Sequence, residues 1–298
     1  MTLDQLRIFI AVAEREHLTK AAAVLNLTPS AASSAIRVLE DRYGAALFHR
    51  VGRRIELTEA GRIFLTEAKA TLARAQAAEL VLSELGGLRR GSLTLQASQT
   101  IASYWLPQRL VRFHDRNPGI ELRLSVGNTE TVTRAVIDGS AELGLVEGEI
   151  DAPAVSARRI ARDRLIVVVA PHHPWAGYTT LPSAEIRTMP WVLREPGSGT
   201  RSVFEGALRR IAIDPATLTV ALELPSNEAV CSAVELGGRA AVMSELAVAA
   251  HIGAGRLVHV PFDIPRRDFL LLRHKERYRA KASLAFEAML GERAASAV

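Results

Sequence analysis

Apolar residues recur at helical spacing through the first part of the chain. From Leu3 onward they lie three or four positions apart, which predicts an amphipathic helix, and two shorter helices are expected on either side of residues 26–29. Two short strands follow at 47–50 and 54–57, joined by a turn. Helices followed by a small hairpin predict a mostly helical N-terminal domain over residues 1–58.

A long helix is predicted next, over residues 59–85. Its apolar positions alternate three and four apart, as in a helix that pairs with a second helix. Two interpretations stay open, namely that it packs on its own domain or that it joins two copies of the chain. Few apolar residues lie nearby in sequence to cover its length, so residues 59–90 are expected to form a dimerisation linker that ends in a hinge. The heptad positions are Leu65, Ala68, Leu72, Ala75, Glu79 and Leu82.

Strands alternate with helices from residue 92 onward. This alternation is typical of βαβ units and predicts mostly parallel sheets. Two blocks of the same style occur in series, so residues 91–298 are expected to form two α/β subdomains with a cleft between them. Subdomain I is expected at about 91–161 and 266–298, and subdomain II at about 162–265. The predicted strands are 92–97, 120–126, 143–146, 165–170, 190–193, 219–224, 240–243 and 267–272.

Composition narrows the class of protein. The 298 residues are 48% hydrophobic and 23% charged, which suits a globular chain and excludes global disorder. No apolar run approaches the roughly 18 residues that a membrane span needs, and no secretory signal is visible. The single cysteine, Cys231, fits a reducing compartment. We therefore expect a cytoplasmic protein without a membrane partner, and its net charge of +5 only hints at a polyanion.

Residues 26–29 have the features of the turn in a helix–turn–helix, whose two short helices cross at a wide angle. Thr28 is a suitable N-cap, and Pro29 fits the first helical position. The helix that follows carries hydroxyls and an arginine on one face, and an arginine-rich turn comes after it. We expect double-stranded DNA to contact both, while a merely solvated serine-rich face is the alternative. The predicted DNA-binding residues are Thr28, Pro29, Ser30, Ser33, Ser34, Arg37, Arg50, Arg53 and Arg54.

Segments that follow predicted strands are suited to binding an anion between the subdomains. Ligands of α/β sheets lie beyond the carboxyl ends of strands, where hydroxyls and N–H groups at helix starts would face them. Glycines before Thr200 would let N–H groups converge, and Arg194 or Arg201 would neutralise the charge. A well-capped helix after a tight turn is the alternative, and the segment lacks the spacing of a nucleotide-binding loop. The predicted effector-binding residues are Ser98, Gln99, Thr100, Asn128, Thr129, Glu147, Arg194, Gly197, Ser198, Gly199, Thr200, Arg201 and Asn227.

No pattern of residues points to catalysis. Neither a Ser-His-Asp arrangement nor a carboxylate pair stands out, and His172 and His173 lie in a Pro-bounded loop without metal-ligand spacing. We expect no enzyme activity, no cofactor and no metal.

Four N-terminal segments carry a further signal, at residues 21–33, 36–40, 47–50 and 57–61. They resemble the signature of LysR-type transcriptional regulators. The resemblance runs through about residue 90 and continues more loosely beyond it. It implies a winged helix–turn–helix, a dimerising linker helix, a periplasmic-binding-protein-like effector domain and homotetramers built as dimers of dimers. RNA polymerase is a further expected partner.

Together these features predict a DNA-binding regulator controlled by a small anionic effector in the cleft. The likeness of residues 98–100 and 196–201 to members that control carbon-fixation and sulfur-assimilation genes implies an organic acid, a phosphometabolite or a sulfur oxyanion. Three other readings stay open: a constitutive DNA-binding protein with a vestigial cleft, a solute-binding module with no regulatory role, and an enzyme fused to a DNA-binding domain.

Overall fold

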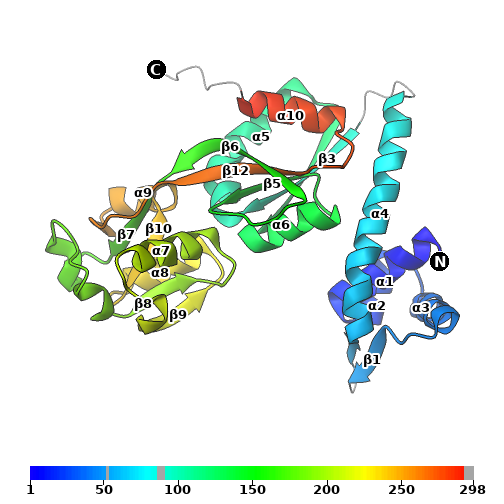
Figure 1. Ribbon diagram of the computed structural model, residues 1–298, viewed down its shortest axis with the longest axis horizontal. Coiled ribbons are helices and arrows are strands. Elements are labelled where there is room, and N and C mark those ends of the chain that lie inside the picture. The colour runs from blue at the N-terminus through cyan, green and yellow to red at the C-terminus, as the bar shows by residue number, and fades with distance from the viewer. Residues whose placement is uncertain (52–53, 86–90, 292–298) are drawn as a thin grey trace. The chain divides into compact units, whose positions relative to one another are not determined.

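The computed structural model of the 298-residue chain describes residues 1–51, 54–85 and 91–291, with the side chains of 50, 51, 54, 80 and 83–85 left aside. The chain forms two compact units, one made mainly of residues 1–88 and one made mainly of the later residues (Figure 1). Each unit is described by itself below. In the described ranges no helix is long and apolar enough to cross a membrane.

The first unit is a small helical domain with a hairpin and one long helix. Thr2 and Gln5 form a capping box that begins the first helix, and Thr28 caps the third, which has Pro29 at its first position. The ring of Phe9 packs against the rings of Phe48 and Phe64, which joins the first helix to the hairpin and the long helix. The elements are α1 (Leu3–Arg15), α2 (Leu18–Val24), α3 (Pro29–Tyr43), β1 (Phe48–Val51), β2 (Arg54–Leu57) and α4 (Glu59–Leu85).

The heptad positions of α4 differ in burial along the helix. Ala68 is buried and Leu65 is partly buried, and both pack with Leu6 and Phe9 of α1. Further along the helix, the Leu82 side chain is 70% exposed in the single chain. The first part of the predicted seam therefore packs on its own domain, and the later part presents apolar surface.

The first sheet of the second unit has helices on both faces. Phe113 of α5 and Phe286 of α10 meet edge to face on one side, with the π-helix η1 beside them. Val132 of α6 packs on the other side. The strand order is β4-β3-β5-β12-β6. The elements are β3 (Gly91–Ser98), η1 (Ile101–Trp105), α5 (Pro107–Arg116), β4 (Ile120–Gly127), α6 (Thr129–Asp138), β5 (Leu143–Glu147), β6 (Val155–Asp163), β12 (Arg267–His274) and α10 (Lys281–Gly291).

The second sheet is built in the same way, in the order β11-β7-β10-β8-β9. Phe204 of α7 packs with Trp191 on one face, and Val230 and Cys231 of α8 pack on the other. The main elements are β7 (Leu165–Val169), β8 (Trp191–Arg194), α7 (Gly199–Arg210), β9 (Val220–Leu224), α8 (Asn227–Glu235), β10 (Ala240–Ser244), α9 (Glu245–Gly253) and β11 (Val258–Val260), with 3-10 turns at η2 (Pro174–Gly177), η3 (Glu185–Arg187) and η4 (Pro215–Thr217).

The sheets are parallel as predicted except for one reversed strand in each, so four of the five strands in each sheet run in the same direction. Each sheet is mixed, because β12 runs antiparallel to β5 and β6 in the first, and β7 runs antiparallel to β10 and β11 in the second. The antiparallel strands adjoin the two passages of the chain between the sheets, β6 to β7 and β11 to β12. The prediction also missed β6, an arginine-rich edge strand without apolar alternation, and β11, which has three residues.

Candidate functional site

Helix α3 exposes the predicted polar face. Ala32, Ile36 and Leu39 are buried beneath it, and the Thr28 hydroxyl accepts a hydrogen bond from the Ala31 N–H at 3.2 Å. The Glu40 carboxylate accepts hydrogen bonds from the N–H groups of residues 47 and 48, at 2.7 and 3.1 Å, which fixes the hairpin against α3. The exposed residues are Thr28, Pro29, Ser30, Ser33, Ser34 and Arg37.

The arginines expected in the hairpin turn are described only in part. Arg50 and Arg54 lie in β1 and β2, and Arg53 lies outside the described residues, as do the side chains of Arg50 and Arg54.

The carboxyl ends of β3 and β5 bring two predicted effector residues together. The buried Ser98 hydroxyl donates to the buried Glu147 carboxylate, and the Thr129 hydroxyl donates to the Glu147 carbonyl at 2.8 Å. Gly199 lies against the same residue, since a Cβ added there would lie 2.2 Å from the Glu147 carbonyl oxygen. The first turn of α7 can approach Glu147 this closely only because position 199 has no side chain.

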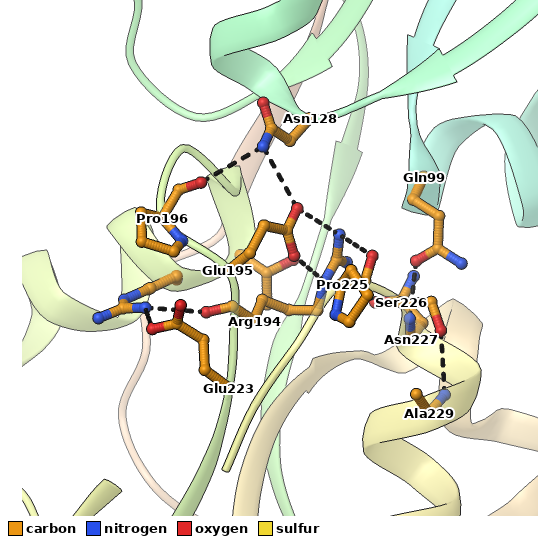
Figure 2. Close-up of polar contacts among 12 residues, drawn as sticks. Gln99, Asn128, Arg194, Glu195, Pro196, Glu223, Pro225, Ser226, Asn227 and Ala229 are labelled. Carbon is orange, nitrogen blue, oxygen red and sulfur yellow. Dashed lines mark hydrogen bonds and ion pairs between the residues drawn. The ribbon is translucent and has the colours of Figure 1, made fainter. Parts of the chain in front are cut away.

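Hydrogen bonds join the two subdomains around Asn227, the first residue of α8 (Figure 2). Its N–H donates to the Gln99 side-chain oxygen at 2.7 Å, and its amide nitrogen donates to the Thr100 hydroxyl at 3.2 Å. The Asn227 side-chain oxygen accepts from Arg194 at 2.8 Å. Three predicted effector residues, Gln99, Thr100 and Arg194, thus each form a hydrogen bond with Asn227.

A second set of contacts joins α6 to the loop before α7. The Asn128 amide donates to the Glu195 carboxylate and to the Pro196 carbonyl, both at 3.3 Å (Figure 2). Gly197 has a φ of +83°, which favours glycine, and a Cβ added there would lie 2.8 Å from the Glu130 carboxylate. Ser198 is the N-cap residue of α7.

The two arginines expected to neutralise the effector already bind carboxylates. Arg194 is buried and forms two hydrogen bonds with Glu195, at 2.8 and 3.0 Å. Arg201 donates to Glu205 at 2.9 Å and also to Glu223. Neither guanidinium is available to an anion without exchanging its carboxylate partner.

A buried ion-pair network, missed in the sequence, lies behind Ser98 and Glu147. The guanidinium of Arg267, which is 3% exposed, lies 2.6 Å from Asp163 and 3.4 Å from Glu147, and it donates to the Thr200 hydroxyl at 2.9 Å. Asp163 also accepts from the buried Ser244 hydroxyl at 2.8 Å. The hint in the sequence is slight: β6 ends with Asp163 and β12 begins with Arg267, but these two residues are 104 positions apart.

Glu228 and Tyr104 lie beside the hydrogen bonds around Asn227, because the Glu228 carboxylate accepts from both Gln99 and Tyr104. Burial would raise the pKa of Glu228, but hydrogen bonds from the backbone, Tyr104 and Gln99 outweigh it, so the pKa is lowered. The pKa of Tyr104 is raised by burial and by the neighbouring Glu228 carboxylate, to which its hydroxyl donates at 2.9 Å. The carboxylate therefore stays charged and holds η1 against α8.

Comparisons with known proteins cover both units. Residues 3–62 match the family "Bacterial regulatory helix-turn-helix protein, lysR family", and residues 86–295 match "LysR substrate binding domain". The chain is 33% identical over 289 residues to the HTH-type transcriptional regulator YeiE of Escherichia coli, covering 96% of each chain. It is 33% identical over 297 residues to the RuBisCO operon transcriptional regulator of Allochromatium vinosum, covering 99% of this chain and 97% of that one.

The second unit is also similar to solved structures of regulatory domains. The regulatory domain of Synechocystis CcmR, in complex with 2-PG, matches with a TM-score of 0.62 and 25% identity, over 67% of this chain and 96% of that one. The relatives are named as transcriptional regulators, and the predicted architecture of an N-terminal helix–turn–helix with a two-subdomain α/β unit is confirmed. The chain belongs to the LysR family of DNA-binding transcriptional regulators with an effector-binding domain.

Proposed function

We propose that a small anion bound between the two α/β subdomains controls DNA binding by this regulator. The named ligand and operon of two similar proteins support an anionic metabolite, since CcmR is described with 2-PG and the Allochromatium vinosum relative as a RuBisCO operon regulator. In this proposal the effector contacts the residues at the ends of β3, β5 and β8 and at the starts of α6, α7 and α8.

The observation that carries the proposal is the set of donors around Glu147. The Ser98 hydroxyl and the Arg267 guanidinium both face its carboxylate, and Thr200 is linked to the same guanidinium. Donors arranged for a carboxylate are suited to another anion of similar size. We infer that the effector exchanges with the Glu147 carboxylate, because two like charges in a buried site repel strongly.

The DNA-binding part of the proposal rests on α3. Its exposed hydroxyls, its capped N-terminus and Arg37 form a face that a major groove can accept, and the arginines of the hairpin would contact phosphates. Residues 1–58 then bind DNA, 59–90 form the linker, and residues from 91 onward bind the effector. The exposed later part of α4, which includes Leu82, supports a homodimer, and the family supports homotetramers and contact with RNA polymerase.

A constitutive DNA-binding protein is the second candidate. It is favoured by the hydrogen bonds that Gln99, Thr100 and Asn128 make across the cleft, since these satisfy the polar groups without a ligand. The two candidates differ in whether any anion changes the affinity for DNA.

The test measures binding of 2-PG and of sulfate to the full-length protein by calorimetry, and then DNA affinity by fluorescence anisotropy with and without the bound anion. We expect the anion to change DNA affinity, and Ser98→Ala to weaken the response while sparing DNA binding without anion. Ser183→Ala, on an exposed loop, is the matched control. If no anion binds, or if binding leaves DNA affinity unchanged, the constitutive reading holds instead.

A further inference from the structure

A cavity lies outside the predicted effector site, where the chain passes between the two subdomains. It has a volume of about 160 Å³ and is lined by residues from both passages and from the start of α9. None of these residues belongs to the predicted effector site. We call it the hinge cavity, and its lining residues are Arg162, Asp163, Arg164, Glu245, Leu246 and Arg266.

The hinge cavity carries excess positive charge. Its Asp163 is already bound to Arg267 at 2.6 Å and to Ser244 at 2.8 Å, and Arg162 lies 3.4 Å from Asp268, a carboxylate that it shares with Arg159. Glu245 is therefore the one lining carboxylate left for Arg164 and Arg266 among the residues that the structure describes. Arg164 lies 3.8 Å from Glu245, and both side chains are about half exposed, which makes this a weak pair. Arg266 forms no ion pair or hydrogen bond with any residue that the structure describes.

The donors of the hinge cavity are guanidinium groups rather than backbone amides. The N–H of Glu245 donates to the Arg164 carbonyl at 2.9 Å, and the N–H of Leu246 donates to the Ser244 hydroxyl at 3.2 Å. The N-terminus of α9 therefore has few N–H groups to offer. Guanidinium groups form paired hydrogen bonds with the oxygens of phosphates and carboxylates.

The volume of the hinge cavity favours a small inorganic anion over a larger organic one. A volume of about 160 Å³ is roughly that of five water molecules, and it is smaller than the roughly 300 to 1,000 Å³ of pockets for organic ligands. We propose that the hinge cavity binds a tetrahedral oxyanion, such as inorganic phosphate or the phosphate group of a small ester, through Arg162, Arg164 and Arg266.

An anion held there would connect both passages of the chain. Arg162 and Arg164 are exposed on either side of the buried Asp163, and the exposed Arg266 immediately precedes the buried Arg267. Asp163 and Arg267 are partners in the register of β6 and β12. A bound oxyanion would therefore bridge the outer side of the same two strands that Asp163 and Arg267 join on the inner side, and it would restrain movement between the subdomains.

The experiment titrates the full-length protein with inorganic phosphate at pH 7.5 in chloride buffer, by calorimetry. The double variant Arg164→Gln/Arg266→Gln is expected to weaken phosphate binding at the hinge at least tenfold. The control variant Arg187→Gln/Arg210→Gln removes the same charge from exposed positions elsewhere and should bind as the wild type does. Ser98→Ala separates the two sites, because it should leave this binding unchanged.

Glycerol 2-phosphate is the second probe. If it binds with the same dependence on Arg164 and Arg266, the site accepts a phosphate group whether free or esterified; if only inorganic phosphate binds, the site is for the free ion. Absence of phosphate binding at millimolar concentration would overturn the proposal. So would equal losses in the two double variants, because they would show an effect of net charge alone.

Discussion

The guanidinium of Arg267 lies 2.6 Å from the carboxylate of Asp163 and joins the start of β12 to the end of β6. Both residues are buried at the place where the chain leaves one sheet for the other. The same guanidinium lies 3.4 Å from the Glu147 carboxylate and donates to the Thr200 hydroxyl at 2.9 Å. The ion pair therefore links the geometry of the hinge to the geometry of the proposed effector site.

Replacing Arg267 should destabilise the second unit strongly. Arg267→Met would leave the carboxylates of Asp163 and Glu147 buried without their cation, and a buried ion pair that loses one partner typically costs about 3 to 5 kcal/mol. Urea unfolding measures this change. Arg273→Met, on the same strand, serves as the control, and comparable unfolding free energies for the two variants would contradict the expectation.

Neutralising Glu147 should strengthen anion binding in the cleft. Glu147→Gln keeps an oxygen that accepts from Ser98 but removes the like charge, and two charges about 5 Å apart repel by about 3 kcal/mol at an effective dielectric constant of 20. We expect an affinity for 2-PG or sulfate at least about tenfold higher by calorimetry. Weaker binding in this variant would mean that the effector does not exchange with the carboxylate.

Removing Arg37 should weaken binding to all DNA sequences. Its side chain is exposed on α3, and each lost phosphate contact lowers the slope of log affinity against log salt by about 0.9. Anisotropy titrations of Arg37→Ala at several salt concentrations measure that slope. Arg187→Ala controls for net charge. A slope equal to that of the wild type, with relaxed preference at one base pair, would instead assign Arg37 to a base.

Cys231 should be inert to thiol reagents and to peroxide in the folded protein. Burial, followed by the nearby carboxylates of Glu235 and Glu228, raises the pKa of its thiol to about 11, so the reactive thiolate is scarce at neutral pH. Labelling with a chromogenic disulfide should be far slower in the folded protein than in urea. Hydrogen peroxide should leave DNA affinity unchanged, as it must in Cys231→Ser. Equally fast labelling in both states would refute this.

His173 should make stability fall in acid. Burial, followed by the charge of His172, lowers the pKa of His173 below its ordinary 6.5, so the unfolded chain takes up a proton more readily than the folded one. Stability is therefore complete above about pH 6.5 and declines as pH falls from there toward the lowered pKa.

The substitution His173→Asn isolates this effect. An Asn oxygen can still accept from the Trp175 N–H, as His173 Nδ1 does at 3.1 Å, without taking up a proton in this range. The unfolding free energy of the variant should decline less between pH 7.5 and 5.5 than that of the wild type. His114→Asn, at an exposed position, should follow the wild-type curve.

Local features of the chain were predictable where local chemistry determines them. Thr28 followed by Pro29 predicts the start of α3, and the helix predicted over residues 59–85 is α4, Glu59–Leu85. The edge strand β6 was not predictable by periodicity, because its arginines pair with residues such as Asp268 on a strand about a hundred positions away.

The candidate site was predictable in its segments but not in its charges. Residues at the carboxyl ends of strands do come together, as Ser98 and Glu147 show. The roles of Arg194 and Arg201 depend on which carboxylates lie beside them in the fold. Arg194 donates to Glu195, and Arg201 donates to Glu223. Charge balance is a property of the three-dimensional arrangement, so the spacing of residues cannot reveal it.

A substitution at Gly199 would change how closely the two subdomains approach each other. A methyl group at this position would lie 2.2 Å from the Glu147 carbonyl oxygen. The close approach of the two subdomains here therefore depends on the missing side chain of Gly199. Any larger residue at position 199 would push the first turn of α7 away from Glu147. The resting state of the regulator is thus open to change by one nucleotide substitution that alters no charge and no hydrogen-bonding group.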